Sequence, residues 1–176
     1  MTTSELIAFC TEKVQRPFLV IGGYAVVAHG YARTTLDLDL LIRKTDREKW
    51  IENLREIGYE PRHVAEVFAQ LVSSTGNIKL DLMFVNNATF DEMFAAAPER
   101  QFETISARIP ALEHLIALKL HVLKQNLRHR ILPDMDDVIH LVLANGVDVR
   151  EPKWRQLFEK YGNLELYEKV RHATQP

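Results

Sequence analysis

The chain of 176 residues carries 22 Lys and Arg against 24 Asp and Glu, a formal net charge of -2, and 47% of its residues are hydrophobic. This composition is that of a globular protein with a core of its own, and it excludes a disordered, collagen-like or coiled-coil chain. The net charge also excludes a uniformly basic nucleic-acid-binding chain, so any contact with nucleic acid requires a local basic patch.

Cys10 is the only cysteine of the sequence. A single thiol excludes an internal disulfide and a zinc site built on several cysteines, and it favours a reducing compartment, so we expect a cytoplasmic protein. The first residues carry no basic segment ahead of an apolar run, and no stretch reaches the roughly 18 apolar residues of a membrane span. We therefore expect neither a secretory signal nor a contact with a membrane.

Apolar periodicity and turn residues predict alternating helices and strands over residues 1–110. Helices are expected at residues 3–14, 24–31, 45–57 and 90–97. Strands are expected at residues 18–21, 36–42, 61–64, 68–73 and 78–85, with a last extended piece at 103–109. Strands 68–73 and 78–85 are expected to form a hairpin with its tip at residues 74–77. This order predicts an α/β (α+β) fold in which helices pack on a mixed sheet.

Beyond Pro110 the apolar pattern becomes helical. Helices are expected at residues 111–128, 134–144, 151–161 and 164–172. We therefore predict two domains, a core of residues 1–110 and a helical region of residues 111–176 that packs on the core.

Asp37 and Asp39 stand in the predicted strand between Leu36 and Ile42. Because side chains alternate along a strand, the leucines at positions 36, 38 and 40 are expected to point inward and both aspartates outward, about 6.5 Å apart. A solvated acidic face is one interpretation. However, Asp disfavours strands and two like charges on one face repel, so the pattern calls for a compensating cation or for solvent.

Asp81 repeats the pattern on another predicted strand, opposite the apolar positions Ile78, Leu80, Leu82 and Phe84. Carboxylates on one side of a sheet suit Mg²⁺ or Mn²⁺, which take oxygen ligands. Two such ions bracket an in-line displacement at phosphorus. Asp81 is then a metal ligand, a general base for an acceptor hydroxyl, or both.

Gly22 and Gly23 follow a strand and open a helix. Unpaired amides and the helix dipole favour a phosphate at such a place, and glycine permits close approach of the backbone. A tight turn between a strand and a helix also uses a glycine pair, so the structural interpretation stays open. No Gly-Lys-Ser/Thr follows, so this is not a Walker loop.

Together these residues resemble the nucleotidyltransferase superfamily that shares the DNA polymerase β-like fold. Its signature is a hydrophobic strand ending in Gly-Gly or Gly-Ser, then Asp-hydrophobic-Asp on the next strand and one more Asp on a later strand. Ile21-Gly22-Gly23, Asp37-Leu38-Asp39 and Asp81 fill these positions in order. Residues 22–39 look most like bacterial stand-alone nucleotidyltransferases related to abortive-infection toxins. Many relatives have Ser after the first glycine, with its hydroxyl on the phosphates, whereas this chain has Gly23.

The resemblance also implies a Lys motif and an Asp motif in the helical tail. Lys119 lies near the centre of an apolar helical stripe and matches the Lys position, so we expect it to reach the nucleotide phosphates. The alternative is a lysine whose stem lies on the core while its ammonium reaches water. Asp134 and Asp137 match the Asp motif, and Asp134 is expected to pair with Lys119 or Arg33. The alternative is a first helical turn, which favours acids for its dipole alone.

Arg33 matches a position near the active site of the family, with a surface arginine as the competing interpretation. The hypotheses for two further residues are weaker: His29 is expected at a packed helix end, and Thr35 as a strand residue that supports the carboxylates.

The resemblance implies a Mg²⁺- or Mn²⁺-dependent nucleotidyltransferase. It would move a nucleoside monophosphate from an NTP such as ATP to a hydroxyl of an RNA (a tRNA end), a protein or a small molecule, and release pyrophosphate. The main alternative is a non-catalytic nucleotide-binding or regulatory module of the same fold, such as a member of a toxin–antitoxin pair with an antitoxin partner. A further hypothesis is RNA binding through Lys124, Arg128 and Arg130, which the net acidity disfavours.

Overall fold

The structure is a computed structural model that describes residues 1–73, 78–125 and 128–175, without the side chains of residues 128–130. The chain divides into two compact units. Unit 1 contains Met1–Ala25 and Arg33–Ala111, and unit 2 contains Val26–Ala32 and Leu112–Pro176. The segment Val26–Ala32 thus belongs with the helical region, although it lies inside the predicted core in the sequence.

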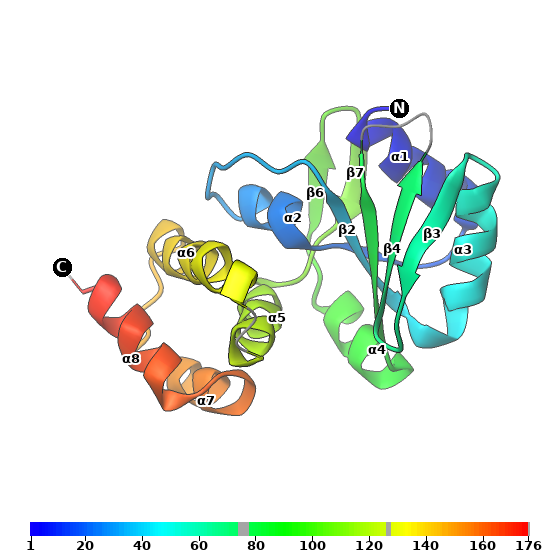
Figure 1. The fold of residues 1–176 in the computed structure, drawn as a ribbon. Coiled ribbons are helices and arrows are strands. Elements are labelled where there is room, and N and C mark those ends of the chain that lie inside the picture. Colours follow the sequence, from blue (N-terminus) through cyan, green and yellow to red (C-terminus); the bar gives the residue numbers. More distant parts are fainter. Residues whose placement is uncertain (74–77, 126–127, 176) are drawn as a thin grey trace. The chain divides into compact units, whose positions relative to one another are not determined.

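Unit 1 is built on a sheet of five strands in the order β1-β2-β5-β4-β3 (Figure 1). The strands are β1 (Leu19–Val20), β2 (Leu38–Arg43), β3 (Tyr59–Val64), β4 (Phe68–Ser73) and β5 (Leu80–Val85). Strands β2 and β5 pair in parallel, and the other neighbours pair antiparallel. The predicted mixed sheet and the antiparallel pairing of β4 with β5 are therefore confirmed.

Alternating leucines explain why β2 and β5 form the centre of this sheet. Leu38, Leu40, Leu80 and Leu82 are completely buried, and the residues between them at positions 39 and 81 are half-buried. Each fully buried leucine contributes about 1.5–3 kcal/mol to folding. A register shift by one residue would exchange the two faces, so the leucines specify which side chains lie on the opposite face.

The remaining elements of unit 1 lie beside the sheet and near the ends of its strands (Figure 1). They are α1 (Thr3–Phe9), a π-helical turn (Cys10–Val14), α2 (Gly22–Ala28), a 3₁₀ turn (Lys44–Asp46), α3 (Arg47–Arg55) and α4 (Asn87–Ala95). A second sheet pairs β6 (Glu99–Phe102) with β7 (Ile105–Arg108). Trp50 of α3 is buried with its ring edge-on to Phe18. Cys10 is buried in the same unit, and burial raises the pKa of its thiol to about 12.

Besides small shifts of strand ends, the structure changes two predictions about strands. Pairing of β2 begins at Leu38 with Leu80, so Leu36 lies in a loop and is 75% exposed. The inward position predicted for Leu36 is therefore wrong, because alternation holds only where a strand has a neighbour. The extended piece predicted at 103–109 is the second arm of the β6–β7 hairpin, whose first arm was not predicted.

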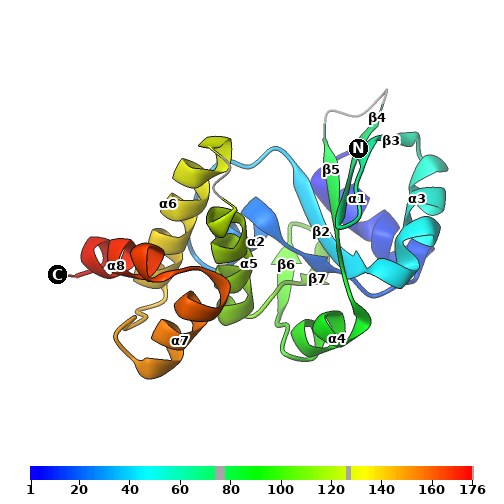
Figure 2. The ribbon, with the colours of Figure 1, turned by 60° about the horizontal axis from the view of Figure 1, so that its bottom comes forward.

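Unit 2 consists of helices (Figure 2). They are α5 (Leu112–Lys124), α6 (Arg128–Ala144), α7 (Pro152–Tyr161) and α8 (Leu164–Ala173), with the last turn of α2. Helix α5 contacts α6 and α7, and α8 contacts α6 and α7. Helix α6 begins six residues before the predicted helix 134–144 and contains Pro133. Within the described ranges, no helix combines the length and apolar character required to cross a membrane.

Candidate active site

Asp39 and Asp81 lie side by side on the central strands of unit 1. They are direct register partners of the parallel pair β2–β5. Both are half-buried, whereas their neighbours at positions 38, 40, 80 and 82 are buried on the opposite face. The structure therefore brings these two predicted carboxylates together on one face of the sheet.

Asp37 lies outside the sheet. It occupies a bend one residue before β2, and it is half-exposed. Its carbonyl oxygen accepts a hydrogen bond of 3.5 Å from the Thr35 hydroxyl. The strand alternation predicted for Asp37 and Asp39 thus applies to Asp39 alone, because Asp37 lies in the loop that leads into the strand.

Gly22 lies directly beneath the carboxylate of Asp39. The Ile21 amide donates a 2.9 Å hydrogen bond to the Asp39 carbonyl oxygen, which holds the end of β1 against this residue. Gly22 has φ +60, and a Cβ placed on it would come within 1.9 Å of Asp39 Oδ2. Both the left-handed backbone and the close approach require glycine here. The predicted glycine turn and the predicted carboxylate are therefore parts of one site.

Gly23 is covered by Thr35 and Arg33. A Cβ on Gly23 would lie 2.3 Å from Thr35 Oγ1 and 3.0 Å from Arg33 Nη2. Arg33 is half-buried, and its Nη1 donates to the Thr34 carbonyl oxygen at 3.1 Å. These contacts place Arg33 beside the glycine pair, which favours a site residue over an isolated surface arginine. Thr35 lies in the loop before β2, so its predicted place in the strand is wrong.

Two residues near Asp81 in the sheet or the chain were not singled out by the sequence. Gln70 of β4 is the antiparallel register partner of Asp81. Lys79 is exposed just before β5, and its carbonyl oxygen accepts a 2.9 Å hydrogen bond from the Leu38 amide. Alternation along residues 78–85 would place Lys79 on the face of Asp81, whereas the position of Gln70 depends on strand order.

Lys119 of unit 2 is bound by two aspartates of α6. Its Nζ lies 2.6 Å from Asp134 Oδ1 and 2.7 Å from Asp137 Oδ2. Lys119 is 5% exposed and each aspartate 1%. The expected Lys119–Asp134 pair is confirmed, whereas a lysine reaching water is excluded. The interpretation of both acids as first-turn residues is wrong, because α6 begins at Arg128 and they are buried inside it.

Three other predicted features belong to unit 2. The His29 carbonyl oxygen accepts a 3.0 Å hydrogen bond from Asn145 Nδ2, as expected of a packed helix end. Lys124 is exposed at the end of α5. The side chains of Arg128 and Arg130 lie outside the described residues, so the basic patch they would form with Lys124 stays a prediction.

No family model matches the chain, and no curated protein matches it in sequence. Solved structures do match. The solution structure of the antibiotic-resistance factor ANT(2″)-Ia is 18% identical over 96% of this chain and 86% of that one, with a TM-score of 0.60. The same protein in complex with adenylyl-2″-tobramycin is 18% identical over 99% and 97%, with a TM-score of 0.59. The lincosamide antibiotic adenylyltransferase LnuA with bound lincomycin is 18% identical over 80% and 96%, with a TM-score of 0.56.

The chain has the nucleotidyltransferase fold. The fold class predicted from the sequence and the resemblance to the nucleotidyltransferase superfamily are thus confirmed at the level of the fold. The specific likeness to abortive-infection relatives stays a prediction.

The donor set of this nucleotidyltransferase-fold protein suits a hard divalent cation. Asp37, Asp39 and Asp81 offer carboxylate oxygens, which Mg²⁺ and Mn²⁺ prefer, and Gly22 leaves space where any side chain would displace the Asp39 carboxylate. Over residues 1–73, 78–125 and 128–175, no three acidic, histidine or cysteine side chains lie close enough together to hold one ion. Binding therefore requires the carboxylates to turn toward a common point.

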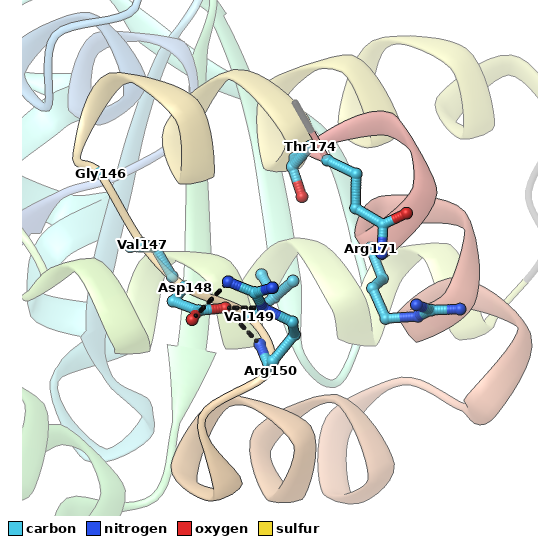
Figure 3. Close-up of a pocket in the computed structure, with 8 residues that line it drawn as sticks. Gly146, Val147, Asp148, Val149, Arg150, Arg171 and Thr174 are labelled. Carbon is cyan, nitrogen blue, oxygen red and sulfur yellow. Dashed lines mark hydrogen bonds and ion pairs between the residues drawn. The ribbon is translucent and has the colours of Figure 1, made fainter.

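A hollow of about 170 Å³ in unit 2 is separate from these residues (Figure 3). Arg150 on its wall is held by Asp148, with Nε–Oδ1 and Nη2–Oδ2 distances of 2.7 and 3.0 Å. Arg171 lies 2.7 Å from Glu168. Because carboxylates balance both guanidinium charges, this hollow offers a weak attraction to an anion, and its described lining includes none of the predicted site residues.

Proposed function

We propose that this chain is a nucleotidyltransferase that moves a nucleoside monophosphate from an NTP to the hydroxyl of an acceptor. The hydroxyl oxygen forms a bond to the α-phosphorus, the bond from that phosphorus to the α–β bridging oxygen breaks, and pyrophosphate leaves. The observation that carries the proposal is the contact of Asp39 with Gly22 beside the register partner Asp81. This arrangement joins acidic groups to a glycine turn that Arg33 and Thr35 cover.

Each residue of unit 1 has a role in this proposal. Asp37 and Asp39 would hold Mg²⁺ or Mn²⁺, which would neutralise the triphosphate charge. Asp81 would accept the proton of the attacking hydroxyl and complete the metal ligands. Gly22 and Gly23 would offer backbone amides to the phosphates, and Arg33, whose Nη2 lies beside Gly23, would contact them through its guanidinium.

Lys79 is exposed directly before β5, and alternation from Asp81 would place its ammonium on the same face. We propose that it interacts with the triphosphate or balances the carboxylates before the nucleotide binds. The nucleotide contacts of Lys119 and Asp134 stay predictions, and the close ion pairs favour a structural role for both.

A small molecule is the acceptor class that the comparisons favour. One similar structure is a complex with adenylyl-2″-tobramycin, and another is lincomycin-bound. RNA and protein acceptors, an antitoxin partner and a non-catalytic role stay predictions of the sequence.

The test is transfer of label. Purified protein is incubated with each α-labelled NTP, Mg²⁺ or Mn²⁺ and separate pools containing tobramycin, lincomycin, total RNA and protein, beside the variant Asp37→Asn. Label moved by the wild type alone identifies the nucleotide and the acceptor class. Metal-dependent NTP binding without any transfer would mean that the acceptor is missing from the pools, whereas no binding would favour the non-catalytic module. Equal transfer by Asp37→Asn would overturn the assigned mechanism.

A further inference from the structure

The side chain of Thr35 lies where a side chain of residue 23 would begin. A Cβ on Gly23 would lie 2.3 Å from Thr35 Oγ1 and 2.7 Å from Thr35 Cβ. Such separations are shorter than real contacts of a Cβ atom allow. Glycine at position 23 therefore leaves space for the hydroxyl of Thr35. Thr35 follows Gly23 by twelve residues, and the loop before β2 brings the two together.

The hydroxyl of Thr35 shares this space with a cation. Arg33 Nη2 lies 3.0 Å from the same Cβ position on Gly23, so a hydroxyl and a guanidinium cover one glycine. Both side chains are half-buried and belong to unit 1. A guanidinium with a neighbouring hydroxyl is a donor set suited to phosphate oxygens.

The present hydrogen bond of the Thr35 hydroxyl is weak. Its acceptor, the carbonyl oxygen of Asp37, is 3.5 Å away, whereas O–H···O bonds in proteins usually span about 2.5–3.0 Å. The hydroxyl therefore loses little when it turns to a stronger acceptor, and an anionic phosphate oxygen is one.

We propose that Thr35 is a nucleotide-binding residue whose hydroxyl donates a hydrogen bond to a triphosphate oxygen beside Arg33. This assignment rests on the proposed function, because it takes the triphosphate of an NTP as the ligand at Gly22–Gly23. It gives Thr35 a direct contact with the ligand, in place of the supporting role expected from the sequence.

The experiment measures binding of inorganic tripolyphosphate in Mg²⁺ by calorimetry, so that neither the base nor the acceptor enters. Thr35→Val removes the hydroxyl and keeps the branched shape, and we expect it to weaken binding about tenfold, as for a lost hydrogen bond to a charged group. Thr35→Ser keeps the hydroxyl and is expected to bind within about twofold of the wild type. Thr45→Val is the matched control, since its hydroxyl contacts Asn87 at the other end of β2.

Moving the hydroxyl from position 35 to position 23 tests whether its place beside Arg33 matters for binding. Gly23→Ser alone is expected to weaken binding, because its Cβ meets Thr35. Combined with Thr35→Gly, which removes both Oγ1 and Cβ of residue 35, the serine has room and returns a hydroxyl to nearly the same place, so the double variant is expected to bind more tightly than either single variant. Circular dichroism and Tm identify any variant that has lost its fold.

Tripolyphosphate binding by Thr35→Val equal to that of the wild type overturns the assignment, and so does a wild type that does not bind this probe. The proposed function is tested separately by transfer of α-label. A wild type that binds the probe through Thr35 but transfers no label leaves the assignment intact and shows that none of the tested pools contains an acceptor. A wild type that transfers label, with Thr35→Val unchanged in binding, contradicts the assignment alone.

Discussion

Acidic side chains in the two units of this protein differ in burial and in their contact with a counter-charge. In unit 1, Asp39 and Asp81 are register partners that remain half-exposed on one sheet face. In unit 2, Asp134 and Asp137 are 1% exposed and both contact the ammonium of Lys119. A carboxylate withdrawn from water requires a close counter-charge, whereas one that serves a ligand must stay accessible. Burial and partners, more than residue type, therefore separate the candidate site from the internal ion pairs.

The largest expected effect is the loss of transfer activity when a half-buried carboxylate of unit 1 is neutralised. Asp39→Asn keeps the shape of the side chain but removes the charge that would hold the metal, so transfer should fall by about 10³-fold or more. Circular dichroism and Tm should stay close to those of the wild type, because Asp39 is only half-buried. Measurable transfer at the wild-type rate would place the chemistry elsewhere.

For the buried acids Asp134 and Asp137 of unit 2, the largest expected effect is on the free energy of unfolding. Lys119→Met leaves two buried carboxylates without their cation, and the free energy of unfolding should fall by about 3–5 kcal/mol. Chemical denaturation measures this change, and adding Asp134→Asn and Asp137→Asn to the same chain should recover part of it. An unchanged stability with a raised KM for the NTP would instead support the nucleotide contact that the family resemblance implies.

Gly22 and Gly146 offer a matched pair of glycines, one in each unit. Both have φ +60, but a Cβ on Gly22 meets Asp39 whereas one on Gly146 meets nothing within 4 Å. Replacement by Ala should destabilise either site by about 1–2 kcal/mol through the left-handed backbone. Transfer should fall by about 100-fold in Gly22→Ala only, because the Asp39 carboxylate is displaced. Equal activity of the two variants would show that Asp39 does not need its present position.

The smallest expected effect concerns Lys79, the exposed cation directly before β5. Lys79→Met should raise the KM for the NTP about tenfold with little change in stability, because the side chain is exposed and its charge would act on the triphosphate. Lys13→Met is the control, since Lys13 is also exposed in unit 1 but lies in the π-helical turn. A similar KM in both variants would remove Lys79 from the site.

Much of the fold was predictable because its signals are local. The alternation of leucines indicated β2 and β5 and the face on which Asp39 and Asp81 lie, and β4 has the predicted bounds Phe68–Ser73. The predictions are wrong where the local structure depends on a neighbouring element. Leu36 fits the alternating sequence pattern, but no strand lies beside it and its side chain is exposed. Helix α6 continues through Pro133, although proline disfavours a helix interior.

Local patterns were enough to select the candidate residues of the site: the glycine pair, the three aspartates and the lysine in an apolar stripe. Side-chain periodicity is a property of a few consecutive residues, so it can be read without the rest of the chain. Which of these residues meet became known from the three-dimensional arrangement alone. The contacts of Gly22 with Asp39, of Gly23 with Thr35 and of Lys119 with two aspartates join residues distant in sequence. Such contacts depend on strand order, loop paths and burial, which no local pattern encodes.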